Sequence, residues 1–156
     1  MDDLCVRALS IRELTQLPKL FKYKDTEKMI KENTENIENK TIDIFGLFKN
    51  GRLIGELRVK YKSEDENEAV CGKRAYLFAF RIHRNFQGKG YGKYLLQSVI
   101  TSLSDRGYCE FTVGVEEDNE RAIHIYRNFG FDKMICRKYE EYEDYGYEYN
   151  LYLKSN

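Results

Sequence analysis

The sequence predicts one α/β domain built around a mixed sheet. Segments with strand-like alternation and segments with helix-like spacing follow one another along the chain. The length of 156 residues suits one compact domain, and a hydrophobic content of 42% is enough for a core. No internal repeat or low-complexity linker divides the chain, so we expect residues 1–156 to form a single domain.

The N-terminal segment predicts a strand followed by two helices. Leu4 to Leu9 has the pattern of a short strand. Ser10, with Glu13 three residues later, has the pattern of a capping box, which begins a helix. Helix-like spacing then runs through residues 11–22 and 25–39.

A hairpin is predicted next. Two apolar runs, Thr41–Lys49 and Arg52–Lys62, flank the dipeptide Asn50-Gly51. Asn-Gly is a strong short-range hairpin signal because both residues tolerate a positive φ. The acidic stretch 64–68 that follows is expected to be a solvated loop.

The rest of the chain predicts strands that alternate with helices. Residues 75–83 predict a strand with Tyr76, Phe78, Phe80 and Ile82 on one face and Leu77, Ala79, Arg81 and His83 on the other. A glycine-rich turn follows at 87–92. The remaining elements are a helix at 92–103 ended by Gly107, a strand at 110–115, a helix at 119–129 closed by Gly130, and strands at 133–139 and 147–153.

Charge and hydropathy exclude several classes of protein. The 26 basic and 26 acidic residues cancel, whereas generic binding to nucleic acid requires a basic excess. Apolar runs are too short to span a bilayer, so no membrane partner is expected. The opening MDDLCVRALS lacks the basic and apolar regions of a signal peptide, and we expect a cytoplasmic location.

The cysteines and histidines predict no metal site. The four cysteines, Cys5, Cys71, Cys109 and Cys136, stand far apart, and there are only two histidines. A zinc site requires ligands at short intervals. Each cysteine lies in or beside an apolar stretch, which predicts small buried side chains in a reducing compartment.

The glycine-rich turn is the segment with the clearest chemistry. Gly88, Gly90 and Gly92 alternate between a strand and a helix. Alternate glycines let the backbone approach a ligand, and their N–H groups add to those of the helix N-terminus to favour an anion such as a pyrophosphate. A tight turn without a ligand is the alternative, because glycine turns are common.

Two well-known phosphate loops do not fit this turn. A Walker A loop has Ser or Thr after Gly-Lys, but Tyr94 follows Gly92-Lys93. A dinucleotide fingerprint needs glycine at its sixth position, where Lys93 stands, and an acidic residue after the next strand.

Positive charge is concentrated in the same region. No acidic residue lies between Glu68 and Asp105, and this window holds six cations that we expect around the turn: Lys73, Arg74, Arg81, Arg84, Lys89 and Lys93. A multiply phosphorylated ligand requires such a concentration of positive charge. A coincidental run on a solvated face is the alternative.

Two motifs resemble those of the GNAT (Gcn5-related N-acetyltransferase) family. Gln87-Gly88-Lys89-Gly90-Tyr91-Gly92 matches the signature Q/R-x-x-G-x-G/A. The segment Asn119–Phe131, which begins thirty-two residues after Gln87, resembles the second motif, N-x-x-A-x-x-x-Y-x-x-x-G-F. The resemblance implies an α/β (α+β) fold with a mixed, mostly antiparallel sheet of six to seven strands flanked by about four helices. It also implies transfer of an acetyl group from acetyl-CoA, as co-substrate, to a primary amine.

The resemblance assigns roles to particular residues. The strand from Phe80 to His83, centred on Ile82, would offer backbone groups to the pantetheine arm and the acyl carbonyl. The N–H groups of Gln87, Gly88, Lys89, Gly90, Tyr91, Gly92 and Lys93 would hold the pyrophosphate. Asn119 would bind the pantetheine region, and Ala122 would pack beside it. Tyr126 would protonate the departing thiolate, with an aromatic core residue as the alternative.

The general base is not assigned by the resemblance. Histone-modifying relatives carry a glutamate eleven residues before the loop glutamine, where this chain has Tyr76, and N-terminal acetyltransferases carry one five residues before the asparagine, where it has Gly114. Glu56 is a candidate, with an ordinary exposed strand glutamate as the alternative, and a base acting through water stays open. Arg84 replaces a proline found in many relatives, which affects loop rigidity.

The acceptor amine is not identified by the sequence. Residues 139–149 combine five tyrosines with the acidic residues Glu140, Glu141, Glu143, Asp144 and Glu148. Such a wall would attract a cationic amine, and a solvated hairpin is the alternative. The acceptor is either a small molecule or a peptide N-terminus or lysine, and a homodimer stays open. A non-catalytic CoA-binding sensor or complex subunit is the competing function.

Overall fold

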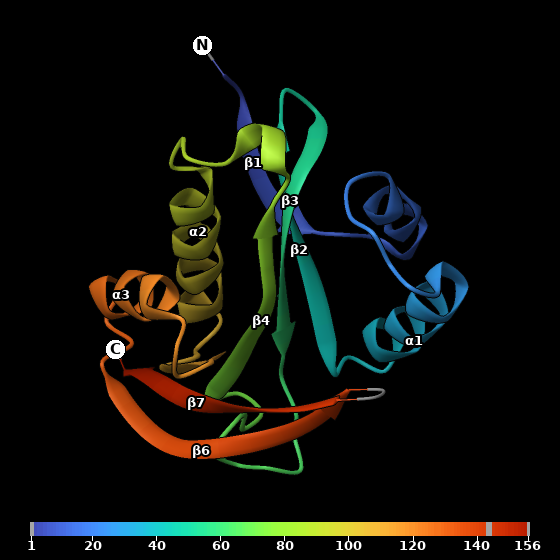
Figure 1. Ribbon diagram of the computed structural model, residues 1–156. Coiled ribbons are helices and arrows are strands. Elements are labelled where there is room, and N and C mark those ends of the chain that lie inside the picture. Colours follow the sequence, from blue (N-terminus) through green and yellow to red (C-terminus); the bar gives the residue numbers. More distant parts are fainter. Residues whose placement is uncertain (1, 143–144, 156) are drawn as a thin grey trace.

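A computed structural model describes residues 2–142 and 145–155 (Figure 1). Its sheet has seven strands in the spatial order β1-β2-β3-β4-β5-β7-β6. The strands are β1 (Leu4–Ala8), β2 (Ile42–Lys49), β3 (Arg52–Lys60), β4 (Arg74–Ile82), β5 (Glu110–Val115), β6 (Lys133–Tyr142) and β7 (Tyr145–Ser155). Among these strands only β4 and β5 pair in parallel. The predicted mixed, mostly antiparallel sheet is confirmed.

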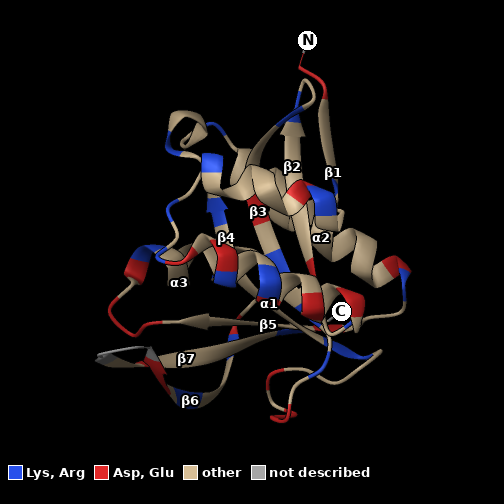
Figure 2. Ribbon diagram, turned by 90° about the vertical axis from the view of Figure 1, so that its right-hand side faces the viewer, with Lys and Arg blue, Asp and Glu red and all other residues tan. Residues whose placement is uncertain are grey.

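Helices cover both faces of the sheet (Figure 1). They are the 3₁₀ helix η1 (Ile11–Lys19), α1 (Thr26–Glu38), the short 3₁₀ helix η2 (Arg84–Phe86), α2 (Tyr91–Asp105) and α3 (Glu120–Asn128). α2 and α3 lie on one side of the sheet, and η1 and α1 lie on the other. Both acidic and basic residues lie along α1, as expected for a helix with one solvated face (Figure 2).

Two apolar cores hold the helices to the sheet. On one face, the apolar stripe of α2, with Leu95, Val99 and Leu103 fully buried, packs on the central strands. On the other face, Leu14 and Leu17 of η1 join the smaller cluster beneath α1. Because β2 and β3 are covered on both faces, they are buried along nearly their whole length.

The local signals of the N-terminal half produce the structures they predict. Ser10 accepts from the Glu13 backbone N–H, and the Glu13 side chain accepts from the Ser10 N–H, which completes the capping box. Asn50 and Gly51 have φ of 51° and 81°, and Lys49 pairs with Arg52 across them. Two positive φ values in a two-residue loop are the geometry that Asn-Gly favours.

The predicted faces of β4 are wrong beyond Phe78. A bulge opposite β3 places Ala79 at φ 50° and breaks the alternation. Phe80 and Ile82 therefore share the α2 face with Leu77, and Arg81 turns to the opposite face. Strict alternation fails because the bulge adds one residue to β4, which reverses the face of every side chain that follows it.

The prediction of four buried cysteines is also wrong. Cys5, Cys71 and Cys109 are exposed, and Cys136 is partly exposed. Cys5 lies on the edge strand β1, and Cys71 and Cys109 lie in the connections that precede β4 and β5. Nearby apolar residues are buried by the strands around them, and that burial does not extend to these turn and edge positions.

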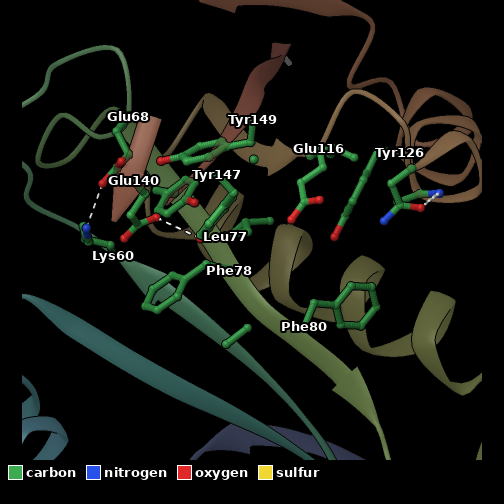
Figure 3. Close-up of a pocket in the computed structure, with 16 residues that line it drawn as sticks. Lys60, Glu68, Leu77, Phe78, Phe80, Glu116, Tyr126, Glu140, Tyr147 and Tyr149 are labelled. Carbon is green, nitrogen blue, oxygen red and sulfur yellow. Dashed lines mark hydrogen bonds and ion pairs between the residues drawn. The ribbon is translucent and has the colours of Figure 1, made fainter. Parts of the chain in front are cut away.

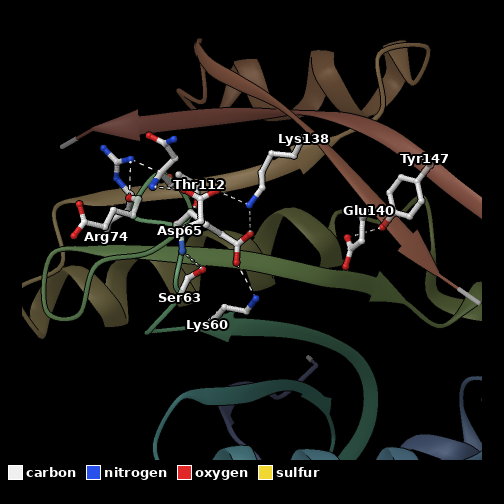
Figure 4. Close-up of polar contacts among 11 residues, drawn as sticks. Lys60, Ser63, Asp65, Arg74, Thr112, Lys138, Glu140 and Tyr147 are labelled. Carbon is white, nitrogen blue, oxygen red and sulfur yellow. Dashed lines mark hydrogen bonds and ion pairs between the residues drawn. The ribbon is translucent and has the colours of Figure 1, made fainter.

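The acidic stretch 64–68 is not uniformly solvated. Glu68 is only 5% exposed, and its carboxylate accepts from Lys60 at 2.8 Å and from Lys138 at 3.0 Å (Figure 4). Lys138 also pairs with Asp65 at 2.6 Å. The paired lysines offset the cost of burying the carboxylate, and they tie this loop to β3 and β6.

Within residues 2–142 and 145–155, no helix is long and apolar enough to cross a membrane. The same described residues contain no group of three or more His, Cys, Asp or Glu side chains arranged to hold a metal ion.

Candidate active site

The two parallel strands diverge halfway along the sheet. β4 and β5 pair from Arg74 opposite Glu110 to Leu77 opposite Val113, and then separate. Beyond this point β4 stays paired with β3 as far as Ile82, and β5 stays paired with β7 as far as Val115. The edge of β4 that faces β5 therefore has no strand partner beyond Leu77 among the described residues. Its backbone polar groups are available to a ligand.

A cavity of about 830 Å³ lies at this divergence (Figure 3). Tyr76 and Phe78 flank Leu77, which packs in the core beneath α2, so they line the cavity from the other face of the sheet; Tyr126 lines it from α3. The cavity therefore connects the two faces of the sheet between β4 and β5. Phe80 also borders a second cavity, of about 570 Å³, beside the glycine turn.

The glycine turn is shaped for close approach of an anion. Gly88 and Gly90 have φ of 76° and 85°, and Gly90 caps α2 without a side-chain hydrogen bond. A Cβ at either position would meet no protein atom within 4 Å, so the protein itself leaves space beside both. The fifteen-residue helix α2 begins here, and the residues of its first turn, whose N–H groups have no partner within the helix, line the second cavity.

Only part of the predicted basic window surrounds the turn. Lys89 and Lys93 are exposed and form no ion pair with a described residue. Lys73 and Arg74 instead pair with Glu110 at 3.8 and 3.1 Å. They lie at the opposite end of the nine-residue strand β4, about 30 Å away. The prediction that they surround the turn is wrong because the strand is extended.

The remaining residues of the first motif have distinct positions. Ile82, Gln87, Tyr91 and Gly92 line the second cavity with the glycines. The Gln87 amide donates to the Ile82 carbonyl at 2.9 Å, which closes the turn on itself. His83 lines neither cavity: its backbone N–H bonds the Ile54 carbonyl at 2.8 Å.

The second motif places three of its residues at the first cavity. Asn119, Ala122 and Tyr126 all line it. The Asn119 Oδ1 accepts from the Ala122 N–H at 3.2 Å and so caps α3. Its Nδ2 donates to no described residue, which leaves this group available to a ligand.

Tyr126 is held as a neutral hydroxyl. Burial raises its pKa to about 12, because the phenolate form would lose hydration. Its ring packs edge-on against Phe131 with centroids 5.6 Å apart. No described residue bonds the hydroxyl, which points into the first cavity (Figure 3).

Glu56 is neither an exposed strand residue nor a free base. Its side chain is fully buried and accepts from Arg58 and Arg81, each at 2.8 Å. Tyr23 also donates to it at 3.1 Å. Both carboxylate oxygens are occupied, and Glu56 lines neither cavity.

The acidic C-terminal segment contributes to the first cavity. Glu140, Tyr147 and Tyr149 line it, and Tyr147 donates to Glu140 at 3.0 Å (Figure 4). These residues therefore belong both to the β6–β7 hairpin and to the wall of the cavity, and Glu140 is exposed there. Glu143 and Asp144 lie outside the described residues.

The sequence model of the GNAT acetyltransferase family matches residues 9–131, which is well over half of the chain. The chain belongs to the GNAT acetyltransferase family. A probable spermine N(1)-acetyltransferase from Bacillus subtilis subsp. natto is 33% identical over 87 residues, which cover 55% of this GNAT chain and 57% of the relative. A ribosomal-protein bS18 alanine N-acetyltransferase from Haemophilus influenzae is 33% identical over 60% of this chain and 67% of its own.

Solved structures show the same fold over nearly the whole GNAT chain. An N-acetyltransferase from Staphylococcus aureus superimposes with a TM-score of 0.73 at 17% identity, covering 98% of both chains. The PaiA N-acetyltransferase from Thermoplasma acidophilum, in complex with coenzyme A, gives a TM-score of 0.68 at 20% identity over 99% of both chains.

Two residues of this GNAT cleft were missed by sequence reasoning. Arg121 lines the second cavity. It lies outside the basic window between Glu68 and Asp105 and was therefore not predicted. Glu116 lines the first cavity beside Tyr126 (Figure 3). Its position directly after a strand and shortly before the Asn119 motif was the available signal.

Proposed function

We propose that this protein transfers an acetyl group from acetyl-CoA to a primary amine by direct attack of the amine on the thioester. The observation that carries the proposal is the divergence of β4 and β5. The first cavity lies at this divergence beside Tyr126, and the second lies beside the glycine turn. Phe80 borders both. An acyl donor with a phosphorylated tail requires these two features at opposite ends of its site.

The turn fits the pyrophosphate of such a donor. The N–H groups of residues 87–93 would bind it at the N-terminus of α2, with Lys89, Lys93 and Arg121 supplying positive charge. The Gly92 backbone packs closely against Phe80, since a Cβ at position 92 would stand 3.4 Å from the Phe80 ring. Bulk at this position would press on the wall of the cavity.

The thioester would lie where the strands separate. The free edge of β4 near Ile82 and the Nδ2 of Asn119 would bind the pantetheine arm, and Ala122 leaves room beside it. The Tyr126 hydroxyl would hydrogen-bond the sulfur and protonate it as the C–S bond breaks. Because its pKa is raised to about 12, the hydroxyl stays protonated and can donate a hydrogen bond to the sulfur as negative charge develops there.

The amine would enter from the sheet face that carries η1 and α1. Tyr76, Phe78 and Glu140 line the first cavity on that side, and aromatic and acidic groups favour an ammonium. The relatives named above act on spermine and on a ribosomal-protein alanine. Both polyamines and peptide N-termini are therefore acceptors to test.

The experiment is release of free CoA thiol from acetyl-CoA across a panel of amines, amino acids, polyamines, aminoglycosides and N-terminal peptides. We expect transfer to at least one amine, with the acetylated product identified by mass spectrometry. Calorimetry in parallel measures acetyl-CoA binding. Binding with no transfer to any acceptor would instead support a non-catalytic CoA-binding role.

A further inference from the structure

An acceptor ammonium must lose a proton before its nitrogen can attack a thioester. Three carboxylates line the first cavity: Glu68, Glu116 and Glu140. Glu68 is held by Lys60 and Lys138, and Glu140 accepts from the Tyr147 hydroxyl. The Glu116 carboxylate forms no hydrogen bond or ion pair with any described residue.

The position of Glu116 is fixed by the backbone around it. It directly follows β5, and its carbonyl accepts from the Asn119 N–H at 3.0 Å in the turn that leads into α3. Glu116 and Tyr126 both line the first cavity, and Figure 3 shows both side chains at one end of it, whereas Glu68 and Glu140 lie at the other end. One unpaired acceptor and one donor are thus present at the same end of the cavity.

The neighbouring position on β5 has no room for a carboxylate. A Cβ added at Gly114 would stand 2.7 Å from the Tyr149 ring and 3.1 Å from the Tyr76 hydroxyl. Burial also raises the pKa of Tyr76. Neither position 76 nor position 114 offers a proton acceptor in this chain.

We propose that Glu116 accepts the proton of the acceptor ammonium, directly or through one water. The assignment rests on the proposed acetyl transfer. The ammonium gives one proton to the Glu116 carboxylate, which releases it to solvent. The neutral nitrogen then forms the C–N bond while the C–S bond breaks. The sulfur takes the Tyr126 proton, and the second nitrogen proton returns to Tyr126.

Two small amines of similar shape test this role. Ethylamine is almost fully protonated at pH 7, whereas trifluoroethylamine is mostly neutral there and needs little help to lose a proton. With ethylamine, Glu116→Gln should lower kcat/KM by about 10²–10⁴-fold, the usual contribution of a general base. With trifluoroethylamine the loss should be much smaller. Acetyl-CoA affinity should change little, because Glu116 takes no part in the phosphate, pantetheine and sulfur contacts proposed above and does not line the second cavity.

Glu117→Gln is the matched control. Glu117 is the next residue, lines neither cavity and pairs with Arg137 at 2.9 Å. It should keep wild-type rates with both amines. Because Glu116 is exposed and unpaired, the glutamine variant should fold, and its unfolding midpoint should match that of the control.

The pH dependence gives a second readout. For Glu116→Gln, kcat/KM with ethylamine should rise about tenfold per pH unit, following the free amine. The other titratable groups that line the first cavity are Lys60 on β3, Glu68 before β4, Tyr76 on β4, Tyr126 on α3, Glu140 on β6, and Tyr147 and Tyr149 on β7. They are common to the wild-type and variant proteins, so the difference between the two profiles reports Glu116.

Equal losses with the two amines, or a Glu116→Gln rate equal to wild type, would overturn the assignment of Glu116. Such a result would leave wild-type acetyl transfer intact. Failure of the wild-type protein to acetylate any amine would count against the proposed function itself, and it would be seen before any variant was compared.

Discussion

The Nε atom of Arg81 lies 2.8 Å from the Oε2 atom of Glu56, and this pair joins β4 to β3 next to the cleft. Arg81 also donates to the Tyr23 hydroxyl at 2.6 Å, and its guanidinium lies 4.0 Å from the Phe21 ring centroid. The segment between η1 and α1 is thereby attached to β4. Ile82, the next residue, lines the second cavity on the opposite face of the sheet.

Loss of the Glu56 charge should destabilise the fold. Glu56→Gln leaves Arg58 and Arg81 facing each other without the carboxylate that both contact. Breaking a buried pair in this way costs about 3–5 kcal/mol in the free energy of unfolding. Urea denaturation measures this change. Glu32→Gln is the control, because Glu32 is exposed and its ion pair with Lys28 is long, at 4.0 Å. A loss no larger than that of the control would show that the cluster does not hold the strands.

The turn should lose CoA affinity when Gly90 gains a side chain. Gly90→Val puts a branched side chain where the phosphates approach the backbone, so the dissociation constant should rise at least about tenfold, or 1.4 kcal/mol. Gly72→Val is the control, because Gly72 has a similar φ of 79°, equally open surroundings and no place in either cavity. Both variants carry the same backbone strain. Calorimetry that finds equal affinities for the two would remove the pyrophosphate assignment.

The exposed lysines of the turn should make CoA binding depend on salt. Lys89→Ala with Lys93→Ala should weaken binding and flatten its dependence on ionic strength, because charge interactions at the surface are screened beyond about 8 Å at 0.15 M salt. Dephospho-CoA should bind the wild-type protein more weakly than CoA if one lysine contacts the ribose phosphate. Lys73→Ala is the control, since Lys73 pairs with Glu110 at the opposite end of β4. If CoA and dephospho-CoA bound the wild-type protein with equal affinities that did not depend on salt, this role would be contradicted.

Local interactions were predictable from the sequence, and interactions between distant segments were not. The Asn50-Gly51 turn and the Ser10–Glu13 box depend on residues within one turn of the chain, and both formed as expected. The bulge at Ala79 depends on how β4 meets β3. The burial of Glu68 depends on Lys138, seventy residues later.

The candidate site divides in the same way. The glycine motif and the asparagine motif are each contiguous in sequence, so their residues were identified in advance. All of the predicted residues in these motifs except Lys89 line one of the two cavities. Glu116 and Arg121 enter the cleft only because β5 diverges from β4 and α3 folds back over it. The fully buried state of Glu56 follows from the arginines on two strands, which no spacing rule reveals.

Removal of the Tyr126 hydroxyl should slow the chemical step. Tyr126→Phe keeps the ring and its edge-on contact with Phe131, so folding and acetyl-CoA affinity should change little. The turnover rate should fall toward the low end of the 10²–10⁴-fold range of general acids, because a CoA thiol is already a fair leaving group. An interaction made mainly in the transition state lowers kcat and kcat/KM together.

The pH profile separates a proton donor from a packing residue. The raised pKa of about 12 keeps Tyr126 protonated across the range in which the protein is assayed, so the wild-type rate should show no alkaline loss from Tyr126 below about pH 11. Tyr91→Phe is the matched control, since Tyr91 also lines a cavity but lies beside the turn, away from the thioester. If Tyr126→Phe matched that control in single-turnover kinetics, where chemistry alone is observed, Tyr126 would only pack against α3 and Phe131. A selective loss in Tyr126→Phe, with the acetyl-CoA dissociation constant unchanged, places the hydroxyl at the sulfur.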